Sequence, residues 1–115
     1  MKTAPYGSWK SPISARTLVD EVVGLGSVRL VGEEVCWIES RPSEGGRCAP
    51  MRRRADGQVA ECTPSSLNVR TRVHEYGGGA YAVEGEVAYC ANFADQRLYR
   101  VVAGQIPQPL TPEIA

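Results

Sequence analysis

The 115-residue sequence has a single histidine, and none of its four cysteines form a CxxC pair. Zinc sites usually combine such cysteine pairs with histidines, so a metal site is not expected. The sequence has no run of ~18 apolar residues, so no segment is expected to span a membrane. It also has no excess of charge, with 13 basic and 13 acidic residues. Nucleic-acid and membrane-surface binders usually carry a net basic face. We therefore expect no metal or other cofactor, no nucleic acid and no membrane among its partners.

The beginning of the sequence, MKTAPYGSWKSPISA, also lacks the apolar core of a secretory signal. This absence predicts a cytoplasmic protein, in which thiols stay reduced. We expect the cysteines to be free and buried in strands, at Cys36, Cys48, Cys62 and Cys90. Two disulfides would require an oxidising compartment, which nothing in the sequence supports.

The run Arg52–Arg54 is the local exception to the balanced charge. Runs of basic residues bind nucleic acids in some proteins, but most lie on solvated surfaces. We interpret this run as an arginine-rich strand with a solvated face.

One segment has the pattern of a helix. Ser11 or Ser14 can cap its first turn, and apolar residues follow at helical spacing. Glycines at 24 and 26 can end it. The pattern predicts a short helix over about 15–23, within an N-terminal leader of residues 1–26.

After residue 26 the sequence changes to short β-rich runs separated by Gly, Pro and Asp. The first set of runs covers 27–31, 35–40, 47–54 and 58–62, with an Asp-Gly turn before the last. The second set covers 79–83, 87–93, 97–102 and 106–110. Each set predicts four strands joined by hairpin turns.

The two sets of strands match each other in sequence. GEEVCW aligns with EGEVAY, so that Trp37 corresponds to Tyr89, and ADGQVAECTP aligns with VAGQIPQPLTP. A repeat of ~40–50 residues with four strands is typical of a β-propeller blade. We therefore predict an all-β fold, the first two four-stranded blades of a β-propeller, preceded by the leader and its short helix. Blade 1 covers 27–67 and blade 2 covers 68–115.

Two blades do not complete a propeller. Closure needs at least about four blades, and two leave apolar sheet faces and edge strands open. We therefore expect the chain to be the start of a longer protein, and to fold poorly or self-associate when isolated.

Several stretches resemble the prolyl oligopeptidase family, in its branch of dipeptidyl-peptidase and acylaminoacyl-peptidase-like enzymes. The stretches are APYGSWKSPISA near the start, VRTRVHEYGGGAY in the middle, VCWIESRPSEGGR and LYRVVAGQIPQPLTPE. The resemblance implies a serine peptidase whose N-terminal β-propeller covers a C-terminal α/β-hydrolase domain carrying the catalytic triad. It also implies peptide substrates, which the propeller would gate or orient.

The resemblance assigns no catalytic residue to this chain. The G-x-S-x-G motif of the hydrolase nucleophile is absent, and His74 comes too early to be the triad histidine. We therefore expect the chain to be non-catalytic by itself, with its hydrolase domain outside this sequence. The alternatives are a non-enzymatic propeller that serves as an interaction scaffold, or a truncated product without independent activity.

The stretch HEYGGGAY gathers the residues that look most like a site. A strand follows it, whereas a phosphate loop requires a helix. His74 and Glu75 are adjacent, so in a strand they point to opposite faces and do not form a catalytic dyad. We interpret Gly77, Gly78 and Gly79 as structural, allowing a sharp turn and a close approach to a neighbouring strand.

A binding role for the same stretch remains open. Arg72, His74 or Glu75 can bind a peptide terminus if this loop faces the cavity between propeller and hydrolase domain. A guanidinium would hold a carboxylate, and a carboxylate would hold an α-amino group.

Other candidate sites have simpler explanations. Glu33 and Glu34 resemble a paired-carboxylate amine anchor, but they fall in a predicted turn and are expected to be solvated. The leader residues Tyr6, Trp9 and Pro12 line a ligand groove or, as we prefer, pin the leader against the hydrolase domain. We expect the remaining aromatic residues to form the core between blades, at Trp37, Tyr81, Tyr89 and Tyr99.

Overall fold

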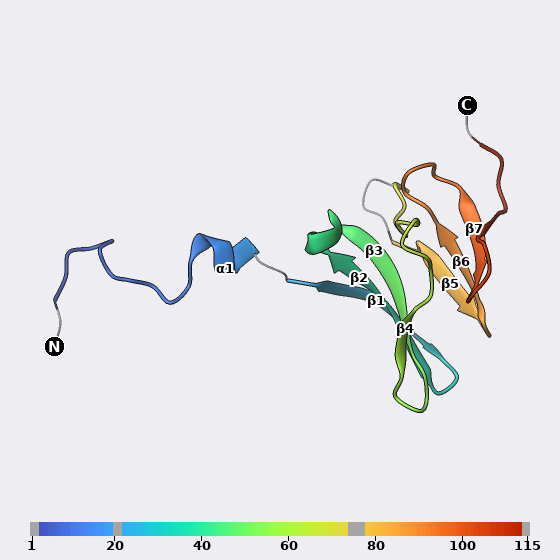
Figure 1. Ribbon diagram of the computed structural model, residues 1–115, viewed down its shortest axis with the longest axis horizontal. Coiled ribbons are helices and arrows are strands. Elements are labelled where there is room, and N and C mark those ends of the chain that lie inside the picture. The colour runs from blue at the N-terminus through green and yellow to red at the C-terminus, as the bar shows by residue number, and fades with distance from the viewer. Residues whose placement is uncertain (1–2, 20–21, 74–77, 114–115) are drawn as a thin grey trace.

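The computed structural model describes residues 3–19, 22–73 and 78–113, which form two four-stranded antiparallel sheets preceded by a leader. Figure 1 shows the sheets side by side, with the leader extending away from them. The first sheet contains β1 (Gly24–Val31), β2 (Glu34–Arg41), β3 (Arg47–Arg53) and β4 (Val59–Glu61), in that order. The second contains β5 (Tyr81–Glu84), β6 (Val87–Ala91), β7 (Leu98–Val102) and β8 (Gln108–Pro109). This confirms the predicted pair of propeller-type sheets, which do not close into a ring.

The helix is shorter than predicted. α1 (Ala15–Val19) is capped by Ser14, whose Oγ accepts a hydrogen bond of 3.0 Å from the Thr17 N–H. The prediction that glycines at 24 and 26 end this helix is wrong, because both belong to β1 and pair with β2. The apolar residues 22 and 23 precede a strand, so their helical spacing was coincidental.

The main core lies between the two sheets. Its buried residues are Cys36, Leu67, Val69, Ala80, Tyr81, Ala88, Cys90 and Val101, with Tyr99 packed against them. Tyr81 and Tyr99 are therefore where the sequence predicted them. Trp37 and Tyr89 are not part of this cluster, because strand alternation directs them to the opposite faces of their sheets. They occupy corresponding places in the two sheets, as the sequence alignment predicted.

All four cysteines are free. Burial raises the pKa of the Cys62 and Cys90 thiols to about 11, and it also raises the pKa of Cys36. These three thiols are therefore protonated at neutral pH and behave as small apolar groups in the core.

The segment between the sheets forms hydrogen bonds with both of them. The Val69 N–H donates to the Cys48 carbonyl at 2.9 Å, and the Asn68 side-chain oxygen accepts from the Cys48 N–H at 2.9 Å. On the other side, the Asn68 carbonyl accepts from the Phe93 N–H at 2.8 Å. Asn92 completes the link, since its side-chain oxygen accepts from the Asn68 N–H at 3.1 Å. The connection thus fixes the end of β6 relative to the start of β3.

A second link between the sheets is ionic. Arg52 forms an ion pair with Glu34 of its own sheet, and its Nη1 donates to the Gly85 carbonyl of the second sheet at 2.5 Å. Arg54 binds both carboxylate oxygens of Glu86, at 3.0 and 2.8 Å. The prediction of a solvated arginine strand is therefore wrong for Arg52, which is buried.

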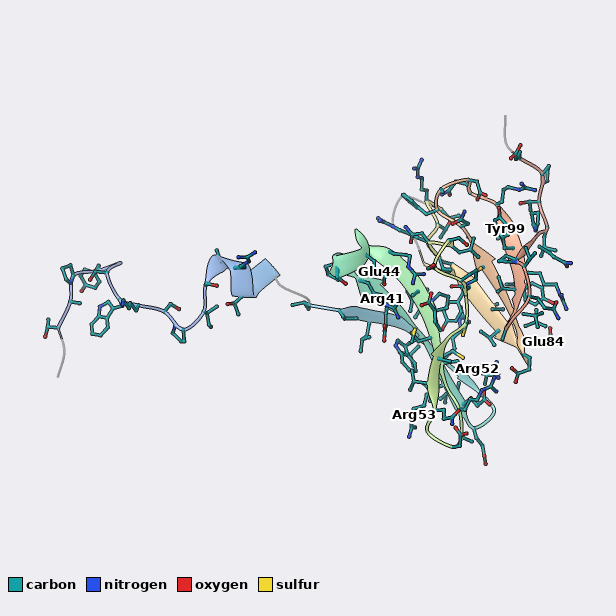
Figure 2. All side chains as sticks on the ribbon, in the orientation of Figure 1. Arg41, Glu44, Arg52, Arg53, Glu84 and Tyr99 are labelled. Atoms are coloured by element: carbon teal, nitrogen blue, oxygen red, sulfur yellow. The ribbon has the colours of Figure 1, made fainter. Side chains whose placement is uncertain are left out.

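Alternation along β3 explains the difference between these arginines. Residues 52 and 53 point to opposite faces of the sheet, so only one of them faces the second sheet. Figure 2 labels Arg52 on the side toward the second sheet and Arg53 away from it. Arg53 is exposed.

The outward face of the first sheet carries its own network of charges. Arg41 bridges Glu39, Glu44 and Glu61, and Arg47 bridges Glu44 and Glu61, with atom separations between 2.7 and 3.1 Å. Arg41 and Glu44 are labelled in Figure 2. Glu39 and Arg41 are both half-buried, and their ion pair offsets the cost of burying each charge.

Two of the three central glycines are described, and Gly77 lies outside the described residues. Gly78 and Gly79 have φ values of 95° and 61°. A Cβ at either position would meet nothing within 4 Å. The left-handed backbone, rather than close packing within this chain, is what favours glycine there.

Replacing Arg52 with Ala should destabilise the link between the sheets by about 2–4 kcal/mol, because Glu34 and the Gly85 carbonyl lose their partner. Arg54 remains 3.5 Å from Glu34 and limits the loss. Hydrogen exchange of the β2 and β3 amides in the complete protein measures the change in opening free energy. The control Arg53→Ala should change it by less than about 0.5 kcal/mol. Equal changes in opening free energy for the two substitutions would show that Arg52 does not stabilise the link between the sheets.

Replacing Gly79 with Ala should destabilise the start of β5 by about 1 kcal/mol, because alanine disfavours a positive φ. Gly26→Ala is the matched control, since a Cβ there also meets nothing within 4 Å and its φ is not positive. Hydrogen exchange of the β5 and β6 amides measures the loss of stability in each of the two variants. A neutral Gly79→Ala would contradict the conformational explanation.

Candidate functional site

Arg72 is the only one of the three predicted binding residues that the described part of the chain places. Its side chain is exposed, and its guanidinium lies 4.6 Å from the centroid of the Phe93 ring. His74 and Glu75 lie outside the described residues. The site is therefore built around Arg72 and its neighbours.

Arg70 joins Arg72 on the same aromatic ring. Its guanidinium carbon lies 4.9 Å from the Phe93 centroid, within cation–π range. Thr71 between them is buried, so the extended chain presents both arginines on its exposed side. The predictions missed Arg70 and Phe93. Arg-x-Arg spacing was visible in the sequence, but nothing local indicated that residue 93 would lie beneath it.

Gln96 holds the parts of this cluster together. Its side-chain nitrogen donates to the Phe93 carbonyl at 2.7 Å, and its side-chain oxygen accepts from the Arg72 N–H at 3.4 Å. It has a φ of 56°, a left-handed conformation that costs a non-glycine residue on the order of 1 kcal/mol. The turn between β6 and β7 thus has a strained backbone at Gln96, the residue that links Phe93 to Arg72.

The carboxylate of this turn is already occupied. Asp95 accepts hydrogen bonds from the Tyr99 hydroxyl at 2.6 Å, the Arg97 N–H at 3.1 Å and the Asn92 amide at 3.1 Å. Burial acts to raise the pKa of Asp95, but these hydrogen bonds outweigh it and the net pKa is lowered. Asp95 therefore stays ionised and supports the turn, and it does not pair with the arginines above it.

Neither Arg70 nor Arg72 forms an ion pair within the described residues. Arg41, Arg47, Arg52 and Arg54, by contrast, all contact carboxylates. The described residues leave the N–H groups of the two guanidiniums on Phe93 available for an external acceptor. This arrangement can bind an anion with planar oxygen geometry.

A pocket of about 200 Å³ adjoins Arg70. Its lining is mostly apolar and consists of Ser27, Ile38, Cys48, Val69, Arg70, Thr71, Gly78 and Ala80. Ser27 has a φ of 51° at a bulge between β1 and β2, and its carbonyl accepts from the Tyr81 hydroxyl at 2.6 Å. Burial raises the pKa of Tyr81 to about 12, so this hydroxyl remains a donor.

The other sequence candidates form no such site. Glu33 is exposed in the β1–β2 turn, as predicted, while Glu34 is half-buried against Arg52 and Arg54. Tyr6 and Trp9 of the leader are exposed. Within residues 3–19, 22–73 and 78–113, no group of three His, Cys, Asp or Glu side chains is arranged to hold a metal ion. No helix in the described part of the chain is long and apolar enough to cross a membrane.

No family model and no curated protein matches the chain. Solved structures do match it. A puromycin-hydrolyzing peptidase of Mycobacterium tuberculosis is 39% identical, with a TM-score of 0.87, and the match covers 97% of this chain. A puromycin hydrolase is 40% identical over 97% of this chain, with a TM-score of 0.81. A mutant of puromycin hydrolase complexed with PGG is 41% identical over 96%, with a TM-score of 0.82.

The chain spans only 18% of the length of each of these peptidases. Identity near 40% over almost all of this chain nevertheless agrees with the family resemblance of its middle motif. The two unclosed four-stranded sheets match the N-terminal propeller portion of such a peptidase. The chain belongs to the prolyl oligopeptidase family, in which it corresponds to the N-terminal β-propeller portion.

Proposed function

We propose that this chain is the part of a serine peptidase that gates or orients peptide substrates, and that catalysis takes place in an α/β-hydrolase domain outside it. The observation that carries the proposal is the match to puromycin-hydrolyzing peptidases over 97% of this chain. The absence of a G-x-S-x-G motif from the sequence agrees with a non-catalytic role. The proposed partners are a peptide substrate, further propeller blades and the hydrolase domain.

We assign substrate contact to the segment that follows the first sheet. Arg72 is exposed there, and His74 and Glu75 come next in the sequence. A guanidinium that can hold a terminal carboxylate and a carboxylate that can hold an α-amino group are therefore available within a few residues. We assign residues 27–67 to blade 1 and residues 68–115 to blade 2.

The exposed sheet faces support the proposal of further blades. Leu25, Leu30 and Val59 of the first sheet are 69%, 79% and 51% exposed, and Leu98 of the second is 47% exposed. A propeller blade normally buries such side chains against its neighbours.

The isolated 115-residue chain should fold poorly or self-associate, because exposed apolar side chains and edge strands of both sheets remain uncovered. Sedimentation velocity at several concentrations would show species larger than a monomer. A monomer that unfolds cooperatively on heating would contradict this expectation.

The complete protein should hydrolyse short chromogenic peptides. It should also hydrolyse puromycin, the compound after which its structural relatives are named. A serine-directed inhibitor should abolish turnover, and the purified 115-residue chain should show none. Turnover by this chain alone, sensitive to the same inhibitor, would contradict the division of roles. An inactive complete protein would favour the interaction-scaffold alternative.

A further inference from the structure

The exposed side chains of Arg70 and Arg72 contact the rest of the fold through the Phe93 ring. Neither guanidinium has an ionic partner in the described residues, whereas Arg47, Arg52 and Arg54 are paired with carboxylates. An unpaired arginine whose side chain moved freely would be an ordinary surface residue. These two are instead positioned on one ring, at 4.9 and 4.6 Å from its centroid.

The ring itself is held firmly. The Phe93 N–H donates to Asn68, and its carbonyl accepts from Gln96, so its backbone is bonded on both sides. Arg70 is also held, because its N–H donates to the Ala91 carbonyl at 3.2 Å. Stacking on a fixed ring limits the freedom of both guanidiniums before any ligand arrives. Such preorganisation lowers the cost of binding.

Backbone strain marks the same place independently. Among the described residues, Ser27 and Gln96 are the two non-glycine residues with positive φ. Gln96 supports the Phe93 end of the cluster, and Ser27 lines the pocket beside Arg70. Strained conformations of this kind concentrate at functional sites, where the surrounding structure maintains them.

The pocket beside Arg70 indicates which chemical group adjoins the bound anion. Its volume of about 200 Å³ is below the ~300 Å³ typical of the smallest sites for drug-sized ligands. Ile38, Val69 and Ala80 give it an apolar lining next to the Arg70 charge. It therefore suits one apolar side chain adjoining a negative group.

We propose that Arg70, Phe93 and Arg72 form a carboxylate receptor for peptide substrates, and that the adjoining pocket accepts the apolar side chain next to the carboxylate. This proposal rests on the proposed function for its ligand class, and it adds the specificity that the site confers. The carboxylate belongs either to the C-terminus of a peptide or to an acidic side chain. Both sources present the same planar pair of oxygens to the guanidiniums.

The test compares binding of matched peptides to the complete protein, treated with the serine-directed inhibitor so that no peptide is hydrolysed, and measured by isothermal titration calorimetry. One peptide ends in Ala-Leu with a free carboxylate, the second is its C-terminal amide, and the third is amidated with an internal glutamate. We expect the free carboxylate, or the internal glutamate, to bind roughly tenfold more tightly than the neutral peptide, as for one charge-assisted contact. Whichever of these two peptides binds more tightly than the neutral peptide identifies the source of the carboxylate.

The variants Arg70→Gln and Arg72→Gln should each reduce that preference, and the double variant should abolish it while still binding the neutral peptide. Arg53→Gln is the matched control, since it removes an exposed guanidinium on the outward face of the first sheet, and it should keep the full preference. Circular dichroism and sedimentation confirm that each variant is folded.

Two results would overturn the proposal. One is equal binding of charged and neutral peptides by the unmodified protein. The other is an unchanged preference in the double variant. If the propeller and hydrolase domains of that variant also separate, the arginines belong to a domain interface. Because binding is measured without turnover, a protein that hydrolyses no peptide can still pass this test. A protein that hydrolyses peptides with no carboxylate preference would disprove this inference alone.

Discussion

The backbone of Asn68 and Val69 is the constraint on which the rest of the structure depends. The two residues use their polar groups on both sides, toward Cys48 in β3 and toward Asn92 and Phe93 after β6. A connection bonded in this way is part of both sheets rather than a loop between them. It determines how far β6 lies from β3, and so the space in which Tyr81, Cys90 and Val101 pack. It also brings Phe93 under the arginines that follow in the chain.

The arginines show how one side-chain type serves two purposes in this small structure. Arg52 lies between the sheets, where Glu34 and a backbone carbonyl offset the cost of burying its charge. Arg72 stacks on an aromatic ring at the surface and leaves its donors unused by the described residues. The difference comes from the available acceptors. Glu34 and Glu86 lie next to Arg52 and Arg54, whereas Asp95 is occupied by Tyr99 and its own turn.

Much of the fold followed from the sequence because its signals are local. Alternating apolar residues and Gly-containing turns located the eight strands, and Gly57 adopts the positive φ that a tight turn requires. Local signals failed where two patterns overlap. Residues 22 and 23 continue the apolar spacing of the helix and glycines at 24 and 26 were predicted to end it, yet β2 pairs with 24–26 and draws them into a strand. Tertiary pairing overrides helical spacing at such a boundary.

The site was only partly predictable for a related reason. Arg72 was identified from its place in the motif, but its partner Phe93 comes from another hairpin. An isolated β-bridge between Val69 and Asn92 sets the register that brings them together. Likewise, Arg52 and Arg53 look equivalent in the sequence. Only the pairing of β3 with β2 decides which of them faces the second sheet. Contacts of this kind depend on sheet packing, which composition and spacing do not encode.

An experimental structure of the complete protein tests the central claim most directly, because it shows what the connection between the first two blades faces. The account predicts that Arg70, Phe93 and Arg72 border the cavity between the propeller and the hydrolase domain, with both guanidiniums open to that cavity. Coverage of these side chains by a neighbouring blade, or their position on the outer rim of the propeller, would contradict it.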